Sequence, residues 1–590
     1  MEFKTASTEF LLASMDRNSR KRSLDDDGDD DDDIGNPYEG DFIQPETPSE
    51  AAISRRHAAR TIHARSGRRS MFVRKEMRGL KAYVTEYCAT TTMHGFRYLA
   101  ESRTSCERYF WLTLLLLAIC VCGVLISRIL LRFMSHPVIV SFSNKESPIN
   151  TVPFPAVTIC PMTKTKRSIF NFTQAIYDVM DGKDITEEQD NLGEYLTLLC
   201  HYSGRHFRES DLLDDDFLEQ LDNVKLDISE FADNCWYLNN WHDRCEKFFW
   251  PIIVDEGICY TFNMLDKHHI FFDDVDIRYI FRFFPKDFFN PQTQWNLSWT
   301  IDQGYTNRSI YAYPYRAYLP GYDNGLHIEF QQSSSELDYL CLDSIQGFSI
   351  LLHAPHVVPQ MKKHHIKVAF GDAVIATVQP NLIKTPDEVR KYHPDIRECY
   401  FTNEKVLLYF KQYSPENCRL ECITNYTLEI CGCVNFHMPR NKSTPICGLG
   451  KYFCMKKAER DLKYLELHNS LNVGKAAFFC DCRPACVHLK YEADHSQSNW
   501  HYDRLYFAKQ RKEMNTSLVH AKLSIVFKYD SFLTSERNEL YGPTDFLANF
   551  GGLLGLFTGF SLLSLIEIIY FLTIRLWCNV RLYNFWAGNV

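Results

Sequence analysis

Two long runs of uncharged residues dominate the hydrophobic pattern of this 590-residue chain. Residues 546–566 form the second run, and as a helix these 21 residues extend roughly 31 Å, about the hydrocarbon thickness of a bilayer. Residues 109–127 form the first run, which Arg128 and Arg132 close. We therefore predict two membrane-spanning helices, over residues 109–132 and 544–574.

Small residues of the second run share one stripe of the predicted helix. At roughly 100° per residue, they gather on one side while large apolar residues cover the others. The five are Ala548, Gly551, Gly552, Gly555 and Gly559. Two interpretations are open: the stripe packs closely against a neighbouring helix, as small-xxx-small patterns do, or it faces the axis of an oligomer and lines a pore.

Between the two runs, helical and strand-like patterns alternate. Two prolines around Phe154 favour an extended entry, and residues 156–159 are β-favouring, so we predict a strand that leads to a disulfide. The same reasoning predicts helices over 186–199 and 211–221, one or two strands within 368–379, and a strand over 522–528. The last strand leads through Gly542 and Pro543 into the second span, which would make it a mechanical link.

Charge sets the expected topology. Residues 1–70 include an acidic run at 25–33 and lack periodicity, so we expect a disordered N-terminal region without a cleaved signal peptide. A basic block covers residues 55–81 and reaches into the pre-span segment at 71–108, and Arg575 and Arg581 follow the second span. The positive-inside rule then places both termini and the 575–590 tail in the cytoplasm. The net charge of -9 argues against a general nucleic-acid binder.

Two further patterns support an extracellular domain over residues 133–543. Six glycosylation sequons all lie between the spans, at Asn171, Asn296, Asn307, Asn425, Asn441 and Asn515. Sixteen of the 21 cysteines also lie there, an even number that suits eight disulfides in an oxidising compartment. The remaining five cysteines are expected to be free or palmitoylated thiols. We therefore expect a plasma-membrane protein in contact with the lipid bilayer.

The cysteines are densest between Cys399 and Cys486. Cys418 and Cys422 share a helix face at their spacing, and Cys480 and Cys482 would lie on one side of a strand. Such pairs fit a disulfide ladder that ties a helix to a strand, or a zinc site in a cytosolic protein. The sequons within this zone favour disulfides, and we expect no metal.

These motifs together resemble the epithelial sodium channel/degenerin family, most closely its insect pickpocket branch. The resemblance covers about residues 83–577. It rests on His94-Gly95 before the first span, FPAVTIC after it, the order of the cysteines, and GLFTGFSLLSLIE in the second span.

The resemblance implies a fold class: two transmembrane helices per subunit and a large disulfide-rich ectodomain shaped like a hand, with a β-sheet palm and a helical thumb at about 399–486. It also implies a homo- or heterotrimer with family subunits. By similarity, the thumb pairs are Cys399 with Cys486, Cys418 with Cys482, Cys422 with Cys480, Cys431 with Cys454, and Cys433 with Cys447. The pairing of the other six ectodomain cysteines stays open.

The resemblance also implies roles in a pore. Gly559, Phe560 and Ser561 match the selectivity tract, and Ala548 matches a position where bulky residues hold family channels open. Asn549 stands where acid-sensing relatives carry an aspartate, which puts calcium or proton action at the pore mouth in doubt. His94 and Gly95 match the gating motif that precedes the first span in the family.

Glu567 is expected near the inner mouth, either as part of a cation-attracting carboxylate ring or as a snorkelling interfacial residue. One conflict arises on an unbroken helix, because Ser561 then lies opposite Gly559 and both cannot line the pore. Either residues 559–561 interrupt the helix, or Ser561 bonds to a neighbouring subunit.

The function implied is a sodium-preferring, amiloride-sensitive cation channel, gated through its ectodomain by a ligand, pH, osmotic or mechanical stimulus. A ring of backbone carbonyls and Ser561 hydroxyls would replace water around permeant Na⁺, and we expect no other cofactor. A non-conducting receptor or auxiliary subunit is the alternative. ATP-gated two-span channels fit less well because they lack this cysteine set and tract. No nucleophile-elbow or metalloprotease motif supports an enzyme.

Overall fold

The structure is a computed structural model of the chain. It describes residues 77–588 apart from 136, 201, 203, 205, 215, 239, 243–244, 277–297, 307–308, 310–311, 342–345, 363–364, 474–479, 512–516 and 541. The expected disorder of residues 1–70 lies outside these, as do three sequon asparagines, Asn296, Asn307 and Asn515. The chain forms two compact units, one from Met1–Thr113 with Leu562–Val590 and one from Leu114–Ser561.

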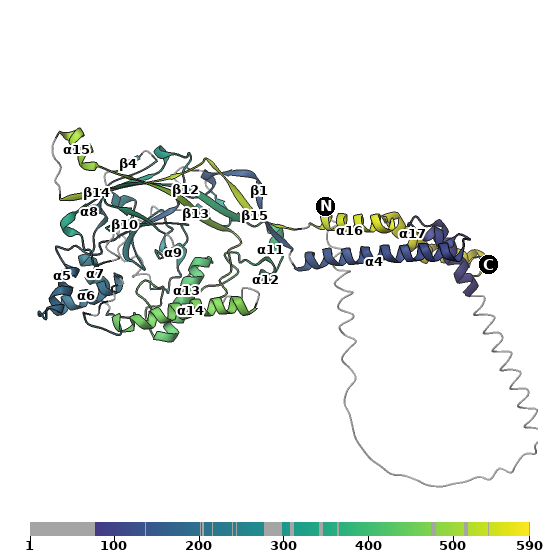
Figure 1. Cartoon of the computed structure of the whole chain (residues 1–590), viewed down its shortest axis with the longest axis horizontal. Coiled ribbons are helices and arrows are strands. Elements are labelled where there is room, and N and C mark those ends of the chain that lie inside the picture. Colours follow the sequence, from purple (N-terminus) through teal and green to yellow (C-terminus); the bar gives the residue numbers. More distant parts are fainter. Residues whose placement is uncertain are drawn as a thin grey trace, which may run out of the picture. The chain divides into compact units, whose positions relative to one another are not determined.

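The larger sheet of the Leu114–Ser561 unit has eight strands among the described residues. Its order is β1 (Val138–Pro148), β15 (Ser531–Glu539), β12 (Asp372–Lys384), β14 (Leu518–Phe527), β9 (Leu326–Ser333), β3 (Ala232–Tyr237) and β4 (Asn240–His242), and β13 (His488–Asn499) also pairs with β12. β12 runs parallel to β14 and β15, and the other pairs are antiparallel. Figure 1 shows these strands at one side of the ectodomain.

A second, antiparallel sheet has five strands in the described chain. Its order is β11 (Ile366–Ala369), β10 (Gly347–His353), β2 (Ala156–Pro161), β6 (Gly257–Phe262) and β5 (Trp250–Val254). β2 is buried along its whole length, as its apolar composition requires, and confirms the strand predicted over 156–159. β11 and β12 confirm the strands predicted within 368–379, and a turn at Gly371 separates them.

Aromatic side chains join the two sheets into one core. Phe330 of β9 stacks on Phe348 of β10 with ring centroids 4.1 Å apart, and Phe231 packs 5.3 Å from Phe348. Phe154 is fully buried, and its backbone nitrogen donates to Tyr315 O across 2.8 Å. The residues around Phe154 therefore anchor the start of β2 in this core.

Helices pack around the two sheets, and some of them contact the larger sheet, as residues 387–390 do at β15 (Figure 1). They are α5 (Phe172–Met180), α6 (Glu187–Leu199), α7 (Phe217–Val224), α8 (Ile228–Phe231), α9 (Lys267–Ile270), α11 (Asp387–Arg390), α12 (Pro394–Arg397), α13 (Pro415–Cys431), α14 (Tyr452–Val473) and α15 (Tyr502–Gln510). A capping box at Thr186 and Gln189 begins α6 where the sequence predicted a helix. The helix predicted over 211–221 begins only at Phe217, because Asp211 and Leu212 pair with the thumb at Gly448 and Cys447 instead.

Five disulfides hold the thumb, and they are the five pairs that the resemblance implied. Cys418 and Cys422 lie on α13, as predicted. The predicted strand around Cys480 and Cys482 is wrong. Asp481 between them has a φ of 46°, and the Lys405 ammonium binds the carbonyls of Cys480 and Asp481 at 3.1 and 2.6 Å, so the backbone bonds to a side chain and not to a strand.

The structure also pairs the six cysteines that the sequence left open. They form Cys160–Cys259, Cys200–Cys341 and Cys235–Cys245. The sixteen ectodomain cysteines therefore make eight disulfides, and the other five, Cys88, Cys106, Cys120, Cys122 and Cys578, are unpaired.

Two segments of the described chain are long and apolar enough to cross a membrane. The first is α4 (Ser105–Ser135), and the second is Leu562–Tyr583. The helix expected over 544–574 is divided into α16 (Pro543–Thr558), α17 (Leu562–Leu572) and α18 (Ile574–Tyr583), so part of the expected tail is helical. β14 does not lead directly into α16 as predicted: β15 follows it and ends just before Gly542.

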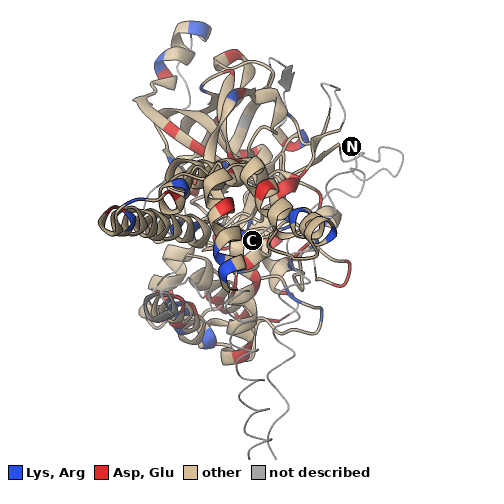
Figure 2. Cartoon of the chain, turned by 90° about the vertical axis from the view of Figure 1, so that its right-hand side faces the viewer, with Lys and Arg blue, Asp and Glu red and all other residues tan. Residues whose placement is uncertain are grey.

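Charged residues of both signs are interspersed along the ribbon (Figure 2). Many form local pairs, such as Lys166 with Glu230 at 2.7 Å and Lys522 with Glu329 at 3.1 Å. Because solvent screens such pairs, each contributes little to stability, and the aromatic core and disulfides hold the fold.

Candidate pore and gating elements

Four of the five small residues of the stripe lie on α16, and Gly559 directly follows this helix. Pro543 occupies its first turn, and the Asp545 side chain accepts from the Gly542 backbone nitrogen at 3.2 Å, which caps the helix. A Cβ atom added at Gly551 or Gly552 would meet no atom within 4 Å in the described chain. The stripe is therefore open within one subunit. Packing against another helix and lining of a pore both remain compatible with this.

Ala548 and Asn549 are exposed near the start of α16. The Asn549 side-chain amide donates to Asp545 O across 2.9 Å, one turn earlier in the same helix. Asn549 thus carries a neutral amide that donates a hydrogen bond to the backbone of its own helix. By resemblance, acid-sensing relatives carry an aspartate at this position.

The helix stops within the predicted selectivity tract. Gly559 adopts the left-handed conformation, with φ 67° and ψ 16°, and its nitrogen donates to Gly555 O across 2.9 Å. Phe560 and Ser561 are outside any helix, and α17 begins at Leu562. The first of the two open explanations is therefore the observed one: the tract interrupts the helix. Gly559 and Ser561 are freed from the helical spacing that placed them on opposite faces.

Glu567 lies on α17 and is bound by the pre-span segment of the same unit. Its Oε2 accepts from the Thr92 nitrogen at 3.1 Å, from the Thr92 hydroxyl at 3.2 Å and from the Thr91 hydroxyl at 3.3 Å. The Thr92 hydroxyl also lies 3.0 Å from the hydroxyl of Ser564, which is fully buried. Neither the carboxylate ring nor the snorkelling role expected for Glu567 involved these partners. Both threonines stand just before His94 and Gly95.

His94 and Gly95 form the turn after these threonines. Gly95 has a φ of 86° and precedes the short helix α3 (Phe96–Ala100), while the His94 side chain is exposed. A residue with a side chain would strain this turn, so glycine is required for the chain reversal. The motif therefore begins only two positions after Thr92, the last residue of the segment that binds Glu567.

The helix over residues 77–90 holds the inner end of α17 and the following helix. The Tyr83 hydroxyl donates to Phe571 O across 2.5 Å, and the Tyr87 ring packs 5.2 Å from the Phe571 ring. Glu86 forms an ion pair with Arg575 on α18. Together with the Thr92 bonds, these contacts hold the pre-span segment against α17 and α18 over two helical turns or more.

In the other unit, strand β15 connects the base of the thumb to α16. Lys391, which follows α11, forms an ion pair with Glu539 of β15. The Arg537 guanidinium donates to Arg397 O of α12 across 3.1 Å, and burial lowers the pKa of Arg537. β15 also pairs with β1, so that Val138 lies opposite Glu539. The base of the thumb therefore contacts the strand that leads into α16, and this strand pairs with the strand that follows α4.

The described sequon residues differ in setting. Asn171 caps α5 by accepting from the Gln174 nitrogen at 3.0 Å, Asn425 lies on α13, and Asn441 is exposed. Among the residues that the structure describes, no group of histidine, cysteine and acidic side chains has the geometry of a metal site.

Comparison with known proteins bears on the whole two-span chain. The family model described as amiloride-sensitive sodium channel matches residues 87–571. Pickpocket protein 28 of Drosophila melanogaster is 28% identical, with 85% of this chain and 80% of that protein covered. Sodium channel protein Nach of Drosophila ananassae is 23% identical over 85% of this chain and 88% of its own length. The bile acid-sensitive ion channel of Homo sapiens is 24% identical, with coverages of 83% and 86%. The chain belongs to the amiloride-sensitive sodium channel family.

Proposed function

We propose that this chain is a pore-forming subunit of a trimeric, sodium-preferring and amiloride-sensitive cation channel of the plasma membrane, with both termini in the cytoplasm. Members of its family are ion channels and not enzymes. The observation that carries the proposal is the break in the helix at residues 559–561, inside an apolar segment. In a membrane, such irregular backbone is tolerated where it lines a water-filled path or is buried in protein.

Three copies of the tract would surround that path. Backbone carbonyls that no longer bond within a helix, together with the exposed Ser561 hydroxyl, then replace water around Na⁺. The stripe that includes Gly551 and Gly552 would face the same axis above the tract, because a Cβ atom added at either glycine meets no atom of the described chain within 4 Å. The helix break supports the pore interpretation, whereas the open stripe is compatible with pore lining and with helix packing alike.

The inner carboxylate and the gating motif would act together. One oxygen of Glu567 is bound by Thr91 and Thr92, so the carboxylate is held in place while its charge still attracts cations toward the inner mouth. His94 and Gly95 would set the position of that segment. We infer that a shift of the pre-span segment changes both the width and the charge of the inner pore.

The stimulus would act on the ectodomain and reach α16 through β15. The contacts that support this route are the Lys391–Glu539 ion pair and the Arg537 bond to Arg397. One relative is named as bile acid-sensitive, so an extracellular ligand is a reasonable first stimulus to test, beside pH, osmotic and mechanical steps.

Recording from cells that express the chain, alone or with a family partner, tests the proposal. We expect a current that reverses near the sodium equilibrium potential and is blocked by amiloride. Ala548→Val should produce a standing current. In Ser561→Cys, an extracellular methanethiosulfonate reagent should reduce the current, whereas Leu556→Cys, an exposed residue off the stripe, should not respond. Surface protein without current under every stimulus and partner would instead indicate an auxiliary subunit.

A further inference from the structure

A cavity of about 300 Å³ lies beneath the thumb helices. Helices α13 and α14 form one side of it, and the turn after β5, the loop after β10 and residues 435–438 form the other. Its size is at the lower end of the range of small-molecule pockets, roughly 300–1,000 Å³. None of the residues proposed for the pore contributes to it.

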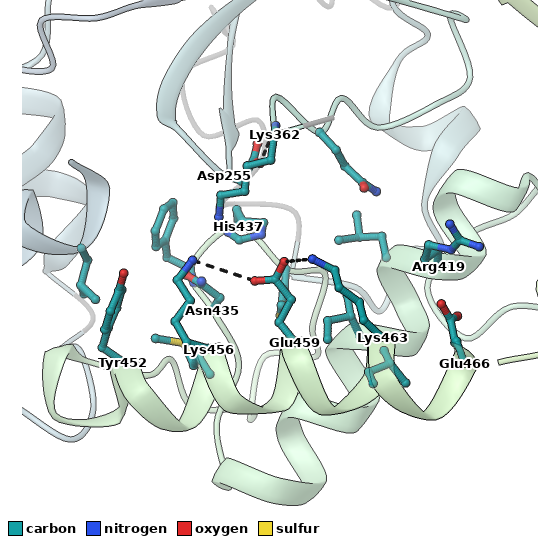
Figure 3. Close-up of a pocket in the computed structure, with 18 residues that line it drawn as sticks. Asp255, Lys362, Arg419, Asn435, His437, Tyr452, Lys456, Glu459, Lys463 and Glu466 are labelled. Atoms are coloured by element: carbon teal, nitrogen blue, oxygen red, sulfur yellow. Dashed lines mark hydrogen bonds and ion pairs between the residues drawn. The ribbon is translucent and has the colours of Figure 1, made fainter. Parts of the chain in front are cut away.

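At one end of this cavity, the positively charged side chains outnumber the acidic side chains that could neutralise them. Figure 3 shows the His437 ring between Lys362 and Asp255 on one side and Lys456 and Glu459 on the other. Burial lowers the pKa of Lys456, and the charge of Lys362 lowers it further. These two ammonium groups therefore repel each other across the cavity.

The two acidic groups at this end are already engaged. Asp255 accepts from the backbone nitrogens of Met361 and Lys362 at 2.8 and 3.1 Å. Glu459 is shared between Lys463 at 2.8 Å and Lys456 at 3.9 Å. Each carboxylate thus neutralises only part of the positive charge around the cavity.

His437 supplies the second, independent indication of a ligand. Among the described residues its buried Nδ1 atom has no hydrogen-bond partner, and burial lowers the pKa of this histidine to about 4. A buried polar atom without a partner is costly, by roughly 1–3 kcal/mol, unless something outside the chain satisfies it. The tautomer that carries a proton on Nδ1 would donate to an anion between the two lysines.

The remaining wall is apolar. Phe436, Met455 and Leu462 are buried side chains that face the cavity, and Leu198 and Ile423 complete this surface. Arg419 and Glu466 line the far end (Figure 3), and Oε1 of Glu466 is buried there without a hydrogen-bond partner among the described residues. The cavity therefore offers a cationic end and an apolar body.

We propose that this cavity binds a small amphipathic organic anion, a carboxylate or sulfonate with an apolar body. The anionic group lies between Lys362, Lys456 and the His437 Nδ1–H, and the body packs against Phe436, Met455 and Leu462. Occupancy ties α14 to the loop after β10. The site is independent of the pore, so its test does not depend on conduction.

Photolabelling of the full-length protein in lipid nanodiscs tests the site. The probe is 4-benzoylbenzoate, whose benzophenone inserts into nearby C–H bonds and favours methionine. We expect saturable labelling of Met455 or Met438, located by peptide mass spectrometry and competed by 1-naphthalenesulfonate. The neutral amide of the probe should label these residues far less.

Matched substitutions on one helix separate the cavity from general surface charge. Lys456→Gln should weaken labelling by about tenfold, because a hydrogen-bonded charge contact is lost. Lys457→Gln changes the next residue, which is exposed and outside the cavity, and should have no effect. Lys362→Gln, at an exposed position where folding is not at risk, should resemble Lys456→Gln. Non-saturable labelling, equal labelling by the neutral amide, or equal effects of Lys456→Gln and Lys457→Gln would overturn the proposal.

Discussion

The backbone nitrogen of Thr92 lies 3.1 Å from Oε2 of Glu567, a residue 475 positions later in the chain. This hydrogen bond joins the segment before the first span to the inner helix of the second. It binds one oxygen of the only acidic residue of α17, and the bond to a charged acceptor is among the stronger hydrogen bonds in proteins. The inner mouth of the proposed pore is therefore built from both ends of the chain.

Substitutions at this pair should separate charge from anchoring. Glu567→Gln keeps the side-chain shape but removes the charge, so the unitary sodium current should fall several-fold. Thr92→Val keeps the charge and the backbone donor but loses the hydroxyl bond, so the open–closed equilibrium should shift by about tenfold with unitary current unchanged. Single-channel recording distinguishes the two. Thr90→Val, whose hydroxyl bonds within its own helix, is the control, and an effect as large as that of Thr92→Val would contradict the assignment.

The left-handed backbone at Gly559 should be sensitive to any side chain. Gly559→Ala places a Cβ atom at a φ of 67°, at a cost of roughly 1–2 kcal/mol, and the tract must relax toward a different geometry. We expect reduced discrimination between sodium and potassium, measured from reversal potentials. Gly123→Ala in α4, where an added Cβ meets no atom of the described residues within 4 Å, should leave selectivity unchanged. Unaltered selectivity in Gly559→Ala would remove this residue from the filter.

The open stripe on α16 gives a second test of pore lining. Gly552→Ala adds a methyl group where the described chain has no atom within 4 Å, so folding of the subunit should be unaffected. If the stripe lines the pore, the trimer persists on native gels while the unitary current falls. Loss of the trimer with this single methyl would show instead that the stripe packs against a neighbouring helix.

Removal of one nested thumb disulfide should cost little stability as long as its neighbour is intact. Cys418–Cys482 spans 64 residues, which alone would contribute roughly 4 kcal/mol. With Cys422–Cys480 intact, the additional ring is only about eight residues long, so Cys418→Ser with Cys482→Ser should cost only about 2 kcal/mol. Thermal unfolding of the purified protein measures this. Removal of both disulfides should lower the free energy of unfolding by clearly more than twice the loss for one. A loss equal to the sum of the two single losses would contradict the nested arrangement.

Acid should destabilise the ectodomain through buried histidines. Burial lowers the pKa of both His353 and His356 to about 4, whereas the unfolded chain binds protons near pH 6.5. The two uncharged rings make their full contribution to the free energy of unfolding above pH 6.5. This contribution is lost as the pH falls toward 4, by up to roughly 3 kcal/mol for each ring. His356→Gln should flatten the fall in melting temperature over this range, and His501→Gln, at an exposed position, should not.

Glu416, a carboxylate in the same region, affects stability in a lower pH range than the two histidines. Burial would raise the pKa of Glu416, but the hydrogen bond and charge of His488, 3.4 Å away, outweigh it and hold the pKa at about 2. The contribution of Glu416 is therefore complete above pH 4.5 and is lost only as the pH falls through 2. A melting temperature constant between pH 6.5 and 4.5 would refute the histidine prediction, because Glu416 does not titrate there.

Local patterns in the sequence determined much of the architecture. The two spans, the helix after Thr186, the buried strand β2 and the strands within 368–379 follow from apolar runs, caps and β-favouring residues, which act over a few positions. The five thumb pairs came from resemblance in cysteine order, because spacing alone leaves the pairing open. Sequence reasoning failed where the backbone bonds to a distant side chain, as Lys405 does beside Asp481.

Only the tertiary structure decided how the proposed pore is supported. The sequence posed the conflict between Gly559 and Ser561, but the left-handed backbone at Gly559 resolved it, since periodicity assumes an unbroken helix. The bonds from Thr92 to Glu567 and the link from Lys391 to Glu539 join residues far apart in the chain. No local pattern encodes such contacts, because they arise only when separate elements pack together.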